Sequence, residues 1–115
     1  MKFQISSNDF VFTPAIKKYL LNKLEKLEKL SGRFGTDLLF EASISRIAHR
    51  HHGENLELVL NLHLPKKIIR SHEKGADVFV LIDAVEAEIL RQLKTEKEKS
   101  LVKVRKGARK AKANS

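Results

Sequence analysis

Two segments of the chain carry lysine and arginine side chains at three-residue spacing, which brings them close together on one side of a helix. They are Lys23, Lys26 and Lys29 in the first segment, and Arg91, Lys94 and Lys97 in the second. Because phosphate groups are bound by cations held close together on a rigid support, both segments are candidate RNA-binding surfaces. Two acids, Glu25 and Glu28, lie among the lysines of the first segment, so a solvated helix surface of mixed charge is the alternative.

The net charge of +9 favours a polyanionic partner such as nucleic acid or an anionic membrane. The charge is unevenly distributed, because residues 1–98 hold 16 basic and 14 acidic residues, a net charge of only +2. The segment from Lys99 onward holds seven basic residues, no acidic residue and few apolar ones. We predict that residues 99–115 form a disordered basic tail, which would bind RNA with little sequence specificity. A tail that serves only solubility is the alternative.

Other kinds of chemistry find less support in the residue types present. The chain has no cysteine, which excludes disulfides, zinc-thiolate sites and cysteine nucleophiles. The histidines His49, His51 and His52 share a turn with Arg50, which would repel a cation, so we expect no metal site there. No spacing suggests an acid–base pair, a nucleophile elbow or a glycine-rich phosphate loop. We therefore expect a protein that is not an enzyme and needs no cofactor.

Aromatic and apolar residues narrow the kind of partner further. Six Phe, one Tyr and no Trp disfavour recognition of single strands by base stacking, and favour recognition of structured RNA through its shape and backbone. The longest apolar stretch, residues 78–82, is far too short to span a membrane, and the polar N-terminus does not resemble a signal peptide. We expect a soluble cytoplasmic protein that is monomeric when free, with no membrane partner and no small-molecule substrate.

Hydrophobic periodicity predicts which elements position the two basic segments. Alternating apolar residues, clearest in a run of leucines at every second position, predict four strands, at residues 2–7, 38–47, 54–64 and 67–73. Apolar residues at steps of three and four predict helices over residues 14–30 and 77–98, with Thr13 and Asp77 as caps. The order β-α-β-β-β-α predicts an α+β two-layer sandwich over residues 1–98. Its four-stranded sheet is mainly antiparallel, and both helices cover one face of it.

Several motifs in the two predicted helices resemble those of a known family. The second helix begins D-V-F-V-L-I-D at residues 77–83 and continues R-Q-L-K at residues 91–94. The first helix begins T-P-A-I at residues 13–16 and continues K-L-E-K-L at residues 23–27. Together with the order of elements, these segments resemble the ribosome hibernation promoting factor family, also called the ribosome-associated inhibitor or sigma-54 modulation family. The resemblance covers residues 2–98.

This resemblance implies a bacterial stress-response factor that binds the small ribosomal subunit and its ribosomal RNA. Such a factor occupies the channel of messenger and transfer RNA, and inhibits translation in dormancy. The resemblance implies that five cations contact the RNA: Lys23, Lys26, Arg91, Lys94 and Lys97. Phe79 stands where the family more usually has a tyrosine, and without a C-terminal dimerisation domain the chain resembles the short form. The residues alone leave open a general structured-RNA-binding module, or a protein-interaction module that uses the open face of the sheet.

Overall fold

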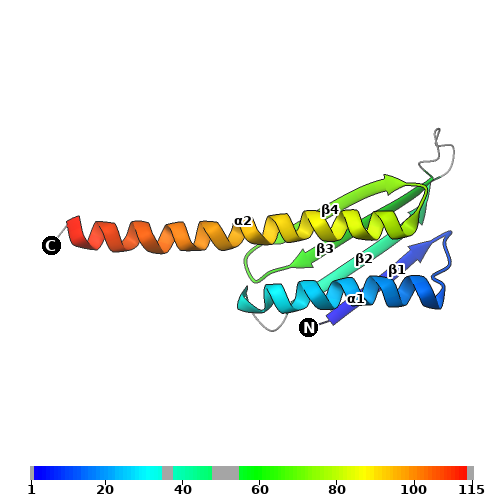
Figure 1. Cartoon of the computed structure of the whole chain (residues 1–115), viewed down its shortest axis with the longest axis horizontal. Helices are drawn as coiled ribbons and strands as arrows, with labels where there is room; N and C mark the ends of the chain where they lie inside the picture. Colours follow the sequence, from blue (N-terminus) through cyan, green and yellow to red (C-terminus); the bar gives the residue numbers. More distant parts are fainter. Residues whose placement is uncertain (1, 35–37, 48–54, 114–115) are drawn as a thin grey trace.

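One four-stranded sheet carries both long helices on the same face (Figure 1). The computed structural model describes residues 2–34, 38–47 and 55–113, with side chains as far as Lys99 except that of Arg33. The elements are β1 (Lys2–Asn8), α1 (Pro14–Ser31), the short 3₁₀ helix η1 (Gly32–Phe34), β2 (Leu39–Arg46), β3 (Leu56–His63), β4 (Ile68–Gly75) and α2 (Val78–Ala113). The predicted α+β two-layer fold and its β-α-β-β-β-α order are confirmed.

The sheet has the strand order β1-β2-β3-β4, so every strand pairs with its neighbour in the sequence. β1 and β2 are parallel, which requires the crossover that α1 supplies, and they pair Phe3 with Phe40. The other pairs, β2–β3 and β3–β4, are antiparallel and form a meander, in which Leu60 lies opposite Ala42 on one side and Ser71 on the other. The prediction of a mainly antiparallel sheet is therefore confirmed.

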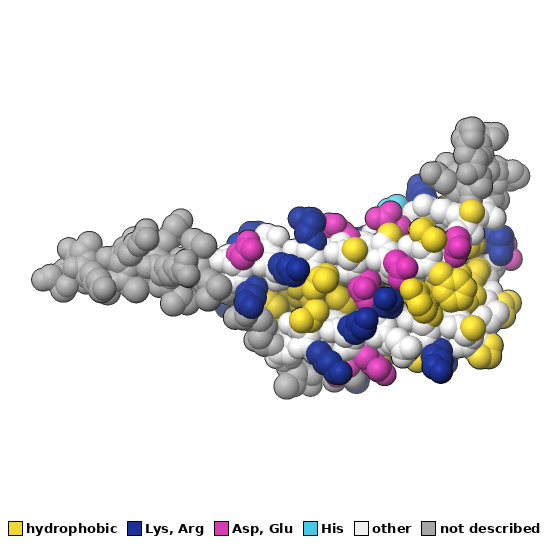
Figure 2. Space-filling model, in the orientation of Figure 1, with side chains coloured by type: hydrophobic (Ala, Val, Ile, Leu, Met, Phe, Trp, Pro, Cys, Tyr) yellow, Lys and Arg dark blue, Asp and Glu magenta, His cyan; other side chains and the backbone are white. Residues whose placement is uncertain are grey.

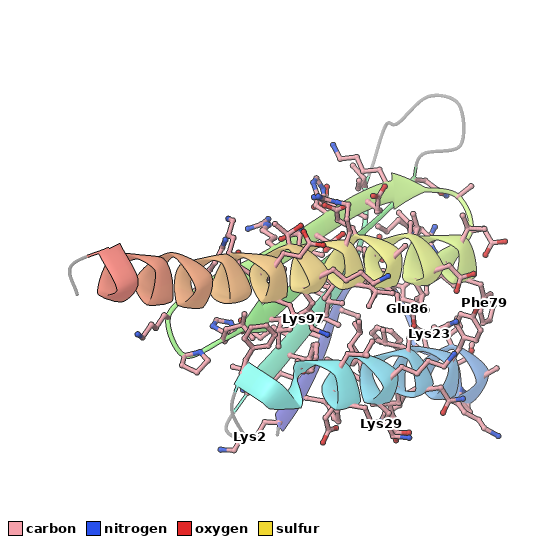
Figure 3. The ribbon with its side chains drawn as sticks, turned by 60° about the vertical axis from the view of Figure 1, so that its left-hand side comes forward. Lys2, Lys23, Lys29, Phe79, Glu86 and Lys97 are labelled. Atoms are coloured by element: carbon pink, nitrogen blue, oxygen red, sulfur yellow. The ribbon has the colours of Figure 1, made fainter. Side chains whose placement is uncertain are left out.

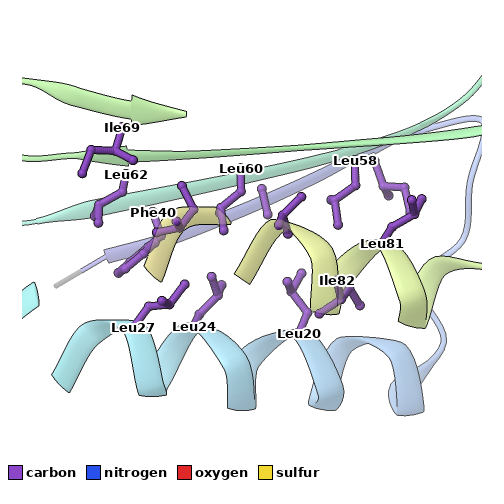
Figure 4. Close-up of a cluster of buried hydrophobic side chains, with 14 of the residues drawn as sticks. Leu20, Leu24, Leu27, Phe40, Leu58, Leu60, Leu62, Ile69, Leu81 and Ile82 are labelled. Carbon is purple, nitrogen blue, oxygen red and sulfur yellow. The ribbon is translucent and has the colours of Figure 1, made fainter. Parts of the chain in front are cut away.

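The core lies between the inward face of the sheet and the two helices (Figure 4). Every second residue of β3 is buried, and Leu58, Leu60 and Leu62 are each at most 1% exposed. The apolar stripe of α1 packs against them through Leu20, Leu24 and Leu27, and that of α2 through Val78, Leu81, Ile82, Val85, Ile89 and Leu93. Because one stripe of each helix is held against the sheet, the opposite sides of both helices are left for contact with solvent or a partner.

Both helices begin at side-chain caps that the sequence predicts. The hydroxyl of Thr13 accepts a hydrogen bond from the backbone N–H of Ile16 at 3.2 Å, and Pro14 occupies the first helical position, where no N–H is needed. The carboxylate of Asp77 accepts a hydrogen bond from the backbone N–H of Phe79 at 2.9 Å. Each cap satisfies a donor that the helix leaves without an internal partner, and so fixes where the helix begins.

The backbone of α2 continues to Ala113, beyond the helix end predicted near Glu98, and in Figure 1 it projects past the sheet. This segment is rich in Lys, Arg and Ala, which have high helix propensity. Extending a helix that is already anchored avoids the unfavourable nucleation of a new one. The division of the chain at residue 98, with a disordered basic tail over residues 99–115, stays a prediction.

Removing part of the core side of α2 should cost far more stability than removing part of its outer side. Ile89 is fully buried, so Ile89→Ala should lower the free energy of unfolding by about 2–5 kcal/mol. Val80 lies on the same helix but is 60% exposed, so Val80→Ala should change it by no more than about 0.5 kcal/mol. Urea unfolding followed by circular dichroism measures both. Equal losses in the two variants would contradict the observed rotation of α2.

Candidate nucleic-acid interface

The two helices pack side by side and run in the same direction, so their outer sides form one continuous surface (Figure 1). Figure 2 shows lysine and arginine side chains over both helices on this surface, with hydrophobic side chains between them. The five residues predicted to bind RNA all lie on these two helices: Lys23, Lys26, Arg91, Lys94 and Lys97. Their surroundings differ, however, and divide them into cations that are already paired and cations that are free.

Lys23 is paired across the gap between the helices. Its Nζ lies 3.7 Å from a carboxylate oxygen of Asp83 and 3.7 Å from one of Glu86, both on α2 (Figure 3). The ammonium group also lies 5.3 Å from the centre of the Tyr19 ring, within range of a cation–π interaction. The charge of Glu86 raises the pKa of Lys23 against the opposing effect of burial, and Tyr19 and Asp83 add to the rise. Only 21% of the Lys23 side chain is exposed.

Tyr19 completes this group of side chains, which we call the interhelix cluster (Tyr19, Lys23, Asp83 and Glu86). Its hydroxyl donates a hydrogen bond of 2.5 Å to Asp83, and that bond is the main cause of a raised pKa for Tyr19. The ring packs edge to face against Phe79, with ring centres 5.2 Å apart. Phe79 therefore has an aromatic partner, and it is 39% exposed.

Arg91 is paired within its own helix. Its guanidinium donates three hydrogen bonds to the carboxylate of Glu88, of 2.6, 3.0 and 3.2 Å. These bonds, together with one from Gln92, lower the pKa of Glu88 to about 2, so the pair keeps both charges across the physiological range. The side chain of Arg91 is 65% exposed, and an RNA phosphate could reach it. Glu88 would nevertheless remain close to any such phosphate.

Four other lysines of the two helices are free. Lys26, Lys29, Lys94 and Lys97 are exposed, and none forms an ion pair with a residue that the structure describes. Lys26 and Lys29 line a shallow hollow on the outer side of α1. Lys94 follows Asp83 by roughly three helical turns, and Lys97 follows Glu86 by the same interval. Lys94 and Lys97 therefore extend the side of α2 that faces α1, and Figure 3 shows Lys97 on that side.

Arg91, Lys94 and Lys97 were expected to project from one side of the helix, but in the structure they point in different directions around the axis of α2. With 3.6 residues per turn, each three-residue step rotates a side chain by about 60° around the axis. Lys94 and Lys97 lie towards α1, whereas Arg91 is turned away from it and towards Glu88. Three-residue spacing places the three cations on successive turns of α2 but could not show that one of them is held by a carboxylate on its own helix.

A second set of contacts, which the sequence analysis missed, fixes α2 to the turn between β3 and β4. Lys67 in that turn donates to Glu96 at 2.5 Å, and Lys99 lies 3.6 Å from the same carboxylate. The Lys67 hydrogen bond is the main reason why the pKa of Glu96 is lowered. The side-chain amide of Gln92 donates to the carbonyl oxygen of Arg70 on β4 at 2.9 Å. These contacts hold the part of α2 that carries Lys94 and Lys97 in a fixed position over the sheet.

The open face of the sheet carries charges of both signs. Glu57 lies 3.0 Å from His72 and 3.9 Å from Lys74, and Glu41 contacts His63. Among the described residues no group of three or more His, Asp or Glu side chains could hold a metal ion, and the histidines of residues 49–52 lie outside them. No helix in the described part of the chain is long and apolar enough to cross a membrane.

On the open face of the sheet, cations and acids lie together. The two-helix surface, with its free lysines, is the better candidate for binding a polyanion.

Comparison with known proteins identifies the family. The family described as sigma 54 modulation protein / S30EA ribosomal protein matches residues 3–100. The chain belongs to this family. A curated S30EA relative, the ribosome hibernation promotion factor of Picosynechococcus sp., is 32% identical over 106 residues, which make up 90% of this chain and 52% of the relative. The chain thus spans about half the length of this relative.

Two solved structures share the fold. The Thermus thermophilus Protein Y N-terminal domain superimposes with a TM-score of 0.63 at 23% identity, covering 83% of this chain and 98% of its own. A ribosomal subunit interface protein from Coxiella burnetii gives a TM-score of 0.65 at 16% identity, covering 85% and 99% respectively. At these identities the likeness shows the shared fold alone.

The pairing of Arg91 with Glu88 predicts a measurable pKa. In the wild type the Glu88 carboxyl should titrate near pH 2, and in Arg91→Met it should return most of the way to its ordinary value near 4.5. Because the folded-state pKa is depressed, the stabilisation by this pair is present above about pH 4.5 and is lost as the pH falls towards 2. Carbon-detected NMR titration of the Glu88 carboxyl in the wild type and in Arg91→Met measures this. A Glu88 pKa that is unchanged in Arg91→Met would show that the pair does not form in solution.

Proposed function

We propose that this chain is a ribosome-associated factor of the cytoplasm. In this proposal it binds ribosomal RNA of the small subunit through its two-helix surface, and inhibits translation in dormancy or stress. Family membership and the name of the Picosynechococcus relative support a ribosomal partner. We choose this surface because it holds free lysines on two helices that are fixed against one sheet. These lysines are Lys26, Lys29, Lys94 and Lys97.

The physical basis is electrostatic binding by a rigid body. Each lysine that neutralises a phosphate releases a condensed counterion, so affinity depends steeply on salt concentration. A flexible chain would pay conformational entropy to align its cations, whereas α1 and α2 are already held by their buried stripes and by the Lys67–Glu96 contact. Inhibition then needs no catalysis, because a folded domain in the channel that messenger and transfer RNA occupy excludes both by its volume.

A second candidate is a general module for structured RNA. The free cations are all lysines, and contacts from lysine to phosphate position a protein without reading sequence. Competition separates the two functions. A ribosomal factor should be displaced from small subunits only weakly by random duplex RNA, whereas a general module should bind both with equal affinity.

Charge reversal on the side of α2 that faces α1 should strongly weaken ribosome binding. Lys94→Glu/Lys97→Glu removes two phosphate contacts and introduces two repulsive charges, so the affinity for small subunits should fall by roughly 10- to 100-fold at physiological salt. Co-sedimentation with purified small subunits measures the loss. The matched control, Lys2→Glu/Arg70→Glu, makes the same change in net charge on the open face of the sheet and should retain binding. Equal losses in the two variants would reject the two-helix surface.

The basic segment at the C-terminal end should increase the affinity for RNA without increasing the preference for small subunits over random duplex RNA. A variant ending at Glu98 lacks seven cations and should bind small subunits more weakly, with a shallower dependence on salt. Its ratio of affinities for small subunits and random duplex RNA should stay close to that of the full chain. A lost preference in the shortened protein would assign recognition to residues 99–115 instead of the two helices.

A further inference from the structure

The side of α2 that faces α1 reverses its charge along its length. Asp83 and Glu86 lie on this side in the first half of the helix, where they meet Lys23 of α1. Roughly three turns later the equivalent positions are Lys94 and Lys97, which have no carboxylate partner among the described residues. Where the two helices face each other, the surface is therefore neutralised at the interhelix cluster, and the same side of α2 is basic further along the helix.

We propose that Asp83 and Glu86 are specificity-determining residues, which neutralise Lys23 and direct the RNA backbone away from the interhelix cluster, towards the free lysines Lys26 and Lys29 of α1 and Lys94 and Lys97 of α2. Lys23 is then a positioning residue that holds α1 against α2, not a direct contact to RNA. This inference rests on the proposed function, because it concerns where on that surface the RNA lies. It makes the position of the RNA depend on carboxylates as much as on lysines.

Releasing Lys23 to a phosphate would expose two carboxylates to an approaching anion. The side chain of Glu86 is only 21% exposed, and its second oxygen, Oε2, is buried without a hydrogen bond from any described residue. Lys23 is the cation that compensates this carboxylate, so its departure would leave a poorly hydrated charge behind. The contact between Lys23 and RNA is therefore opposed both by repulsion from the acids and by the loss of their own partner.

Tyr19 makes the arrangement more rigid. Its hydroxyl holds the carboxylate of Asp83 at 2.5 Å, and its ring lies beneath the ammonium group of Lys23. The lysine thus has three partners on two helices, whereas Lys94 and Lys97 are exposed on one. A phosphate that meets Lys94 or Lys97 displaces only water, which makes the surface around these two lysines the favoured position for the RNA backbone.

The test is to remove the two carboxylates while keeping their shapes. Asp83→Asn/Glu86→Gln should free Lys23, so the affinity for a random RNA duplex should rise about threefold and its log–log salt dependence should steepen by about 0.7–0.9. The preference for small subunits over the duplex should fall accordingly. The matched control, Asp9→Asn/Glu41→Gln, removes two negative charges from residues outside the two helices and should leave the salt dependence unchanged. An equal gain in the control would mean that net charge alone is responsible and would overturn the inference.

Lys23 itself is tested in both backgrounds. Lys23→Met alone should leave the salt dependence unchanged and lower the melting temperature, whereas Lys97→Met should make the dependence shallower by about 0.7–0.9. Adding Lys23→Met to Asp83→Asn/Glu86→Gln should return the salt dependence to that of the wild type. A shallower dependence in Lys23→Met alone, equal to that of Lys97→Met, would show that Lys23 contacts RNA and would overturn the inference.

Failure of the proposed function gives a different result. If the wild type binds neither small subunits nor duplex RNA, the proposed function is wrong and the inference falls with it. If the wild type binds but the carboxylate variant behaves as its control does, only the inference is wrong. Circular dichroism at the assay temperature confirms that each variant is folded, and the isosteric Asn and Gln replacements preserve the acceptor for the Tyr19 hydroxyl.

Discussion

The packing of two apolar helix stripes on the single apolar face of the sheet is the constraint on which the rest of the structure depends. β3 buries Leu58, Leu60 and Leu62 on one side only, so both helices must lie on that side. Once Leu24 and Ile89 are held in the core, the rotation of each helix about its axis is set. Every outward-facing side chain then has a fixed direction, and the candidate interface is the consequence of the core beneath it.

The parallel arrangement of the helices decides which charges meet. α1 is the crossover between the parallel strands β1 and β2. α2 runs back along β4 and points in the same direction as α1. This arrangement brings Lys23 opposite Asp83 and Glu86. With an antiparallel pair, Lys23 would meet a different part of α2 and the same residues would give a different surface. The charge pattern of the interface is therefore a property of the topology as well as of the sequence.

The sequence predicted the fold well because the signals that specify it are local. Alternation along residues 54–64, the caps Thr13 and Asp77, and helical spacing of apolar residues each depend on a few neighbouring positions. The end of α2 was harder to predict, because high helix propensity and low hydrophobicity point in opposite directions after Glu98. Periodicity contains no signal for the short η1 helix after α1, which was also missed.

The ion pairs and hydrogen bonds of the candidate site could be predicted only in part, because several of them join residues that are far apart in the sequence. Arg91 and Glu88 are three residues apart, so their ion pair was available from helical spacing alone. Tyr19 and Asp83 are 64 residues apart, and Lys67 and Glu96 are 29 apart. Those contacts require the relative positions of two elements, which a single sequence does not provide. The five cations were therefore placed on the correct helices without a way to know which were already neutralised.

This distinction changes what the net charge of +9 means for binding. A cation held by carboxylates contributes to the total charge but offers little to a phosphate, because the exchange gains one ion pair and loses another. The free lysines of α1 and α2 are fewer than the basic residues beyond Glu98, but they are held in fixed positions over a sheet. Specificity for one RNA surface needs fixed positions, since a mobile cation finds a phosphate on any polyanion. Position and pairing, more than the amount of charge, should therefore decide which RNA this fold recognises.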